Sequence, residues 1–171
     1  MKKVITILIC FLFAFSLIGC NRNNKIEKIA DTDNQAINNI SENGIDEYFT
    51  ILDETINGYV KLSNEFKEKY KTYSKNQLID YDNKIKKYIK RFGEAREKVG
   101  TYNDKFNEVY DNVLGSLRNL SEASNILINE DKTIEKTKNK AIKKYNESVD
   151  KMEGILKNKK NLKNMILESS N

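Results

Sequence analysis

The chain has 171 residues, enough for one domain with short appendages, and it contains no Pro, Trp or His. Because Pro is the strongest helix breaker and runs of strand-favouring residues are missing, the composition favours only the all-α class. The net charge of +5 is too small to indicate nucleic-acid binding, and the lack of His removes the commonest general base and transition-metal ligand. We therefore expect an all-α protein that is not an enzyme and uses no cofactor or metal.

The first nineteen residues have the pattern of a bacterial signal peptide. Lys2 and Lys3 form a short positive segment, and residues 4–15 are apolar except for one Thr. This apolar run is shorter than the stretch of about 20 residues that spans a membrane. Leu-Ile-Gly-Cys follows at positions 17–20, and the rest of the chain has no cysteine, so no disulfide is expected there.

Residues 17–20 resemble the lipobox of bacterial lipoproteins, and the resemblance implies that residues 1–19 are removed and Cys20 is lipidated. In that family the Cys thiol receives a diacylglyceryl group, and two acyl chains hold a protein stably at a membrane. Membrane lipid is therefore the expected partner through Cys20, at the extracytoplasmic face of the cell membrane. The alternative is an ordinary secretory signal or an anchor helix. Cys10 lies within the apolar run, where we interpret it as a small apolar side chain.

Residues 20–44 are expected to be the lipidated cysteine and a flexible tether. The segment from 21 to 44 is polar and rich in Asn, and its few Ile residues are too sparse to define a buried face. A flexible chain of this length has an r.m.s. span of roughly 25–30 Å, which would lift the folded part clear of the lipid headgroups.

A helical bundle is predicted for residues 45–171, beginning with a helix over 46–73 in which Asp46 is the N-cap. Apolar or core-compatible residues recur in steps of three and four at Ile45, Phe49, Leu52, Ile56, Tyr59, Ser63, Phe66, Tyr70 and Tyr73. The rhythm then slips by one residue. Ser74 and Gln77 have the spacing of a capping box there, which predicts a turn and a new helix.

A heptad pattern over residues 78–127 is the strongest signal in the chain. Every seventh position is apolar: Leu78, Ile85, Phe92, Val99, Phe106, Val113, Leu120 and Leu127. Gly100 suggests a break within this stretch, but the heptad phase is the same on both sides of it. Because a loop has no reason to preserve phase, we favour one continuous helix of about fifty residues. The alternative is two helices separated at Gly100.

The last predicted helix extends from an N-cap at Asp131 to about residue 167, with a looser apolar stripe. The segments 45–73 and 101–131 have net negative charge, whereas 74–100 and 132–171 have net positive charge. Neighbouring antiparallel segments would therefore attract each other. The fold class is an antiparallel long-helix bundle or coiled coil, formed either by three helices with a long central one or by four helices.

Two groups of side chains are candidates for binding. The first is basic and comprises Lys84, Lys86, Lys87, Lys90, Arg91, Lys140, Lys143 and Lys144. This group would attract a polyanion such as teichoic acid or anionic headgroups, although lysines in such helices are usually a solvated face. The second is aromatic, because Tyr48, Tyr59, Tyr70 and Tyr81 recur every eleven residues. They indicate either an aromatic groove or rings that fill a wide core.

The order of lipobox, polar tether and Lys/Glu-rich helices is similar to that of the cell-wall-binding helical lipoproteins of low-GC Gram-positive bacteria, and helical surface lipoproteins of spirochaetes fit almost as well. The resemblance implies a non-catalytic binding or spacer module at the cell envelope. Its partner would be an anionic cell-wall polymer or another envelope protein, and nucleic acid is disfavoured by location. The alternative function is a small-ligand-capturing bundle with an aromatic pocket.

Overall fold

In this computed structural model the described residues are 42–100 and 102–169, and they contain helices and no strand. The elements are α2 (Glu42–Lys69), α3 (Lys75–Val99), α4 (Asp104–Asn129), α5 (Glu135–Asn158), the 3-10 turn η1 (Lys159–Asn161) and α6 (Leu162–Glu168). They belong to one compact unit, Ile37–Asn171. The predicted all-α class is confirmed. None of the described helices combines the length and apolar character that crossing a membrane requires.

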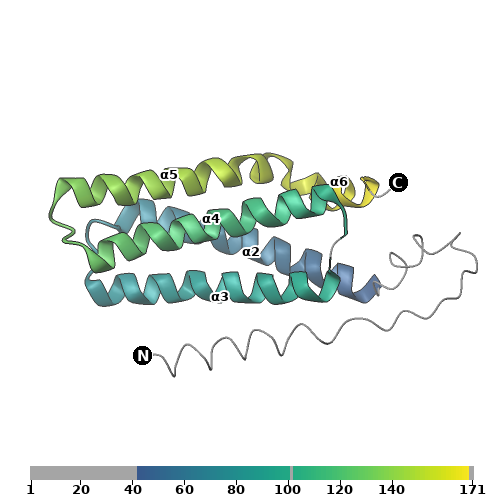
Figure 1. Cartoon of the computed structure of the whole chain (residues 1–171), viewed down its shortest axis with the longest axis horizontal. Coiled ribbons are helices and arrows are strands. Elements are labelled where there is room, and N and C mark those ends of the chain that lie inside the picture. The colour runs from purple at the N-terminus through teal and green to yellow at the C-terminus, as the bar shows by residue number, and fades with distance from the viewer. Residues whose placement is uncertain (1–41, 101, 170–171) are drawn as a thin grey trace, which may run out of the picture. The chain divides into compact units, whose positions relative to one another are not determined.

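The four long helices lie alongside one another, and α2 packs against α3, α3 against α4 and α4 against α5 (Figure 1). Short connections between successive helices make neighbouring helices antiparallel. The architecture is therefore the four-helix bundle, which was one of the two arrangements predicted from the sequence.

The heptad pattern marks the core of this bundle. All eight heptad residues between Leu78 and Leu127 are at most 4% exposed, and they form one hydrophobic cluster with the apolar faces of α2 and α5. The residues of the apolar stripe are therefore buried together, as their spacing predicts, because positions three and four apart fall on one face of a helix.

Gly100 ends α3, so the continuous helix favoured from the heptad phase is wrong. Its φ of 70° and ψ of −153° leave the helical region, and its N–H donates to the Arg96 carbonyl at 3.0 Å. Asn103 then caps α4 by accepting a hydrogen bond from the Phe106 N–H at 2.7 Å. The phase survives because Val99 and Phe106, at facing ends of two antiparallel helices, both point into the same core.

Gly100→Ala is therefore expected to destabilise the protein by about 1–3 kcal/mol, because an L side chain is strained at this φ and ψ. An added Cβ would meet nothing within 4 Å, so the cost comes from the backbone alone. Gly93→Ala is the matched control: it lies inside α3, also with open space around a Cβ, and should stabilise by about 0.5–1 kcal/mol. Urea titration of both variants measures whether each change raises or lowers the free energy of unfolding. A gain in stability for Gly100→Ala would contradict the observed helix end.

Other helix ends agree only in part with the predictions. The capping box is confirmed: Ser74 accepts from the Gln77 N–H at 3.2 Å, and the Gln77 side chain accepts from the Ser74 N–H at 2.8 Å. Asp46 is not an N-cap, because α2 already begins at Glu42. Asp131 is not the cap of α5 either, because its carboxylate accepts the Thr133 N–H in the preceding turn.

The predicted last helix is interrupted at η1, which separates α5 from α6. The interruption lets α6 pack at the end of the bundle where α4 begins (Figure 1). Leu162 and Ile166 are buried there, and the Asn103 side chain donates to the Ile166 carbonyl at 2.7 Å. Because the chain changes course at η1, α6 covers the end of the core.

The alternation of charge along the chain corresponds to ion pairs between neighbouring helices. Basic α3 pairs with acidic α2, and basic α5 pairs with acidic α4 and with Glu130, which directly follows α4. Examples are Arg91–Glu54 at 2.5 Å, Lys98–Glu47 at 2.7 Å, Lys140–Glu130 at 2.9 Å and Lys144–Glu122 at 3.2 Å. Each exposed pair contributes little stability, but together they favour this arrangement of neighbours.

Asp82 is the one buried carboxylate among the residues that the structure describes. Its Oδ1 accepts hydrogen bonds from Ser121 at 2.5 Å, Ser124 at 3.3 Å and Asn125 at 3.2 Å, all on α4. Its Oδ2 lies 2.6 Å from the Lys86 ammonium. The buried charge is therefore fully partnered across the α3–α4 interface.

Candidate functional site

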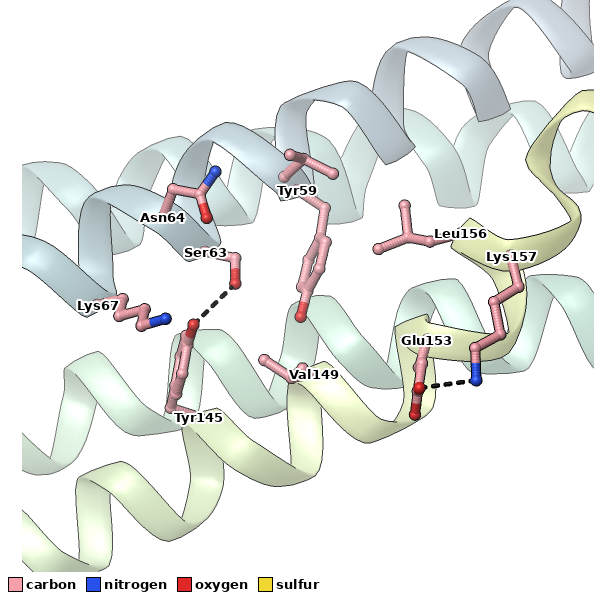
Figure 2. Close-up of a pocket in the computed structure, with 10 residues that line it drawn as sticks. Tyr59, Ser63, Asn64, Lys67, Tyr145, Val149, Glu153, Leu156 and Lys157 are labelled. Carbon is pink, nitrogen blue, oxygen red and sulfur yellow. Dashed lines mark hydrogen bonds and ion pairs between the residues drawn. The ribbon is translucent and has the colours of Figure 1, made fainter.

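An open groove of about 460 Å³ lies between α2 and α5 (Figure 2). The α2/α5 groove is lined by Tyr59, Val60, Ser63, Asn64 and Lys67 of α2 and by Tyr145, Val149, Glu153, Leu156 and Lys157 of α5. In each helix these residues follow the three-and-four spacing of a single face. The groove has the size of clefts that bind small organic ligands, which are about 300–1,000 Å³.

Contacts from α2 to α5 and from α2 to η1 mark the two ends of the groove. At one end the rings of Phe66 and Tyr145 stack with centroids 5.4 Å apart. At the other end Lys159 bridges to Asp53 at 2.9 Å and to Asn57 at 2.6 Å. Between these contacts the groove is lined in part by short side chains, such as Ser63 and Val149, which do not fill the space between the helices.

Buried hydroxyls lie beneath the groove. The Ser148 hydroxyl donates to the Ser116 carbonyl of α4 at 2.7 Å and shares a hydrogen bond with the Tyr59 hydroxyl at 3.0 Å. Burial raises the pKa of Tyr59 above its ordinary value, against the smaller opposing effect of the Ser148 hydrogen bond. Tyr59 therefore stays neutral and anchors the wall of the groove to α4 through Ser148.

The two ends of the groove differ in charge. Glu153 and Lys157 form an ion pair at 2.7 Å at one end, and the hydrogen bond from Lys157 lowers the pKa of the Glu153 carboxyl. The two opposite charges at this end therefore compensate each other. Lys67 lies at the opposite end with Tyr145 (Figure 2). For Lys67 no carboxylate partner is found within residues 42–100 and 102–169.

The wall between these ends is apolar. Val149 is 37% exposed and Leu156 is 40% exposed, and both face the groove with Val60. They are two of the four large apolar side chains that are exposed in the described part of the chain. An apolar wall with a few convergent polar groups is the usual composition of a binding site for a small molecule.

The predicted aromatic row contributes only one ring to this groove. Tyr48, Tyr59 and Tyr81 are buried in the core and Tyr70 is half-buried, so the row mainly fills the core. Tyr145, which was not in the row, supplies the second ring of the groove. Val149 and Leu156 are apolar positions of the last predicted helix that stay exposed in the groove. The wider apolar face that they give this helix was the sequence feature that could have indicated a groove.

The predicted polyanion-binding residues fall on two helices. Lys84, Lys86, Lys87 and Lys90 border one shallow hollow on α3, together with Asp80 and Asn83. Arg91 lies outside this hollow and pairs with α2. In α5, Lys144 pairs with Glu122 of α4, and Lys140 pairs with Glu130, which directly follows α4. Six of the eight predicted residues form ion pairs, and Lys87 and Lys143 form none with the described residues. The structure thus brings half of the set together.

Cys20, the predicted signal peptide and the tether as far as residue 41 lie outside the described residues, whereas positions 42–44 belong to α2. No family model, no curated protein and no solved structure matches this chain in the three comparisons. The candidate site therefore depends on the geometry of the α2/α5 groove.

Proposed function

We propose that this protein is a lipid-anchored extracytoplasmic lipoprotein whose helical bundle binds a ligand, without catalysis, in the α2/α5 groove. The observation that carries the binding function is the groove itself, an open space of about 460 Å³ with an apolar wall and polar ends. The lipobox at positions 17–20 supports the location, because lipidation of Cys20 would hold the bundle at the membrane surface.

Ligand capture is a better proposal than spacing or polymer binding. A spacer needs only a solid core, whereas this bundle has an open groove between two of its helices, α2 and α5. Polymer binding would depend on the basic group, and six of its eight members already have carboxylate partners. Those exposed pairs leave less uncompensated charge for a polyanion.

The groove is expected to bind the neutral dye N-phenyl-1-naphthylamine saturably, with an increase in fluorescence. Residues 21–171 are a suitable fragment for this titration, because they contain the whole compact unit Ile37–Asn171. Val149→Arg should weaken dye binding by about tenfold or more, because a long cationic side chain replaces an apolar part of the wall.

Ile79→Arg is the matched control for this experiment. Ile79 is 38% exposed on α3, close to the exposure of Val149, and it does not line the α2/α5 groove. Dye binding should therefore be unchanged in Ile79→Arg. Absence of saturable binding to the wild type, or an equal loss in both variants, would contradict ligand capture in this groove.

A further inference from the structure

The Lys67 end of the α2/α5 groove has an excess of positive charge. Lys157 at the opposite end is balanced by Glu153 at 2.7 Å, whereas Lys67 has no ion pair with any residue in the described ranges. The carboxylate of Glu65, one position beyond Asn64 on α2, pairs with Lys84 at 3.7 Å and accepts a hydrogen bond from Tyr73. It is therefore engaged on the α3 side of the helix.

A hydrogen-bond donor lies at the same end. The Ser63 and Tyr145 hydroxyls share one hydrogen bond at 3.4 Å in which either oxygen can be the donor, so the Tyr145 O–H can turn from Ser63 toward a bound acceptor. Figure 2 shows the Tyr145 oxygen and the Lys67 ammonium on the same side of the groove, both among the residues that line it. A phenol donor and an ammonium group together suit an anionic oxygen.

The rest of the groove suits an apolar body. Because α2 and α5 are antiparallel, Val149 and Leu156 extend from the Tyr145 end toward Lys157, near Tyr59 (Figure 2). Val60 lines the same groove. A molecule lying along this wall would place one end at Lys67 and cover apolar side chains with the remainder. Burial of that apolar surface would supply most of the affinity.

We propose that the ligand of the α2/α5 groove is a small amphipathic anion. Its apolar part lies along Val60, Val149 and Leu156, and its acidic group accepts hydrogen bonds from the Lys67 ammonium and the Tyr145 hydroxyl. This inference rests on the proposed ligand-binding function and adds the chemical class of the ligand. Charge complementarity favours an anion over a cation, because Glu153, the only carboxylate among the described residues that line the groove, is already paired.

Two dyes that share one ring system test the proposal. 8-Anilinonaphthalene-1-sulfonate carries a sulfonate, and N-phenyl-1-naphthylamine lacks it. With residues 21–171, fluorescence titration should give at least about tenfold tighter binding of the sulfonate dye, once each dissociation constant is corrected for the dye's water solubility. Lys67→Gln should weaken binding of the sulfonate dye by about five- to tenfold and leave the neutral dye unchanged.

Lys61→Gln is the matched control, because Lys61 is exposed on the same helix and does not line the groove. Tyr145→Phe is a second variant that keeps the ring and removes the donor, so it should also weaken only the sulfonate dye. Circular dichroism establishes that each variant is folded. Equal affinity for both dyes, or equal effects of Lys67→Gln and Lys61→Gln, would overturn the anion proposal. Failure of both dyes to bind would overturn the groove's binding function instead.

Discussion

Phe106→Ala is expected to lower the free energy of unfolding by about 3–5 kcal/mol, the usual cost of removing a buried aromatic ring. The Phe106 ring is 1% exposed, and its centroid lies 4.5 Å from that of Tyr48 and 6.0 Å from that of Tyr102. The Arg96 guanidinium lies over the same ring at 4.7 Å, so the ring joins α2, α3 and α4 where α4 begins. A cavity at this point would affect three helices at once.

The measurement is a urea titration of residues 21–171, monitored by circular dichroism. Leu156→Ala is the control, because Leu156 is 40% exposed in the wall of the groove and its truncation should cost less than about 1 kcal/mol. A loss for Phe106→Ala no larger than that of the control would mean that the aromatic cluster at this end is not part of a packed core.

Cys20→Ala is expected to release the full-length protein from the membrane fraction and to abolish incorporation of labelled palmitate. The reason is that the expected anchor is a diacylglyceryl group on the Cys20 thiol, and without it the apolar run ending at residue 15 is too short to span a bilayer comfortably. Fractionation of cells that express each form, followed by detection of the label, measures both effects.

Cys10→Ala is the matched control for the lipidation experiment, because Cys10 lies inside the apolar run and is not expected to be modified. This variant should remain labelled and bound to the membrane. If Cys20→Ala still carries the label and fractionates with membranes, the protein is not a lipoprotein anchored at this residue.

Regular periodicity made most of the fold predictable. The heptad residues from Leu78 to Leu127 are buried as expected, and the Ser74–Gln77 box begins α3 where its spacing predicts. The break at Gly100 was missed because the turn leaves Val99 and Phe106, which are both buried in one core, seven residues apart, the same spacing that a continuous helix would give. In that situation only the backbone conformation of the glycine distinguishes a turn from a continuous helix.

The groove was less predictable than the core. The Tyr row suggested aromatic binding, but helical spacing does not state how closely two non-consecutive helices approach, and that distance opens the seam between α2 and α5. Tyr145 and Lys67 come together from positions 78 residues apart, and no local pattern connects them. The basic group was predicted from local density, which does not reveal that Glu54, Glu122 and other carboxylates neutralise it from neighbouring helices.

The Asp82 cluster also limits how α3 and α4 can slide along each other. If α4 moved by one turn, in one direction Leu117 and Leu120 would occupy the places where Ser121 and Ser124 now donate to the carboxylate. Two donors would be replaced by alkyl groups, and Asp82 would remain charged in an apolar setting, at a cost of several kcal/mol. The same shift would place Ser116 and Ala123 where Leu120 and Leu127 are now buried, so the apolar core opposes it as well. The charged side chain and the leucines thus favour the same register and give this heptad-rich hairpin one alignment.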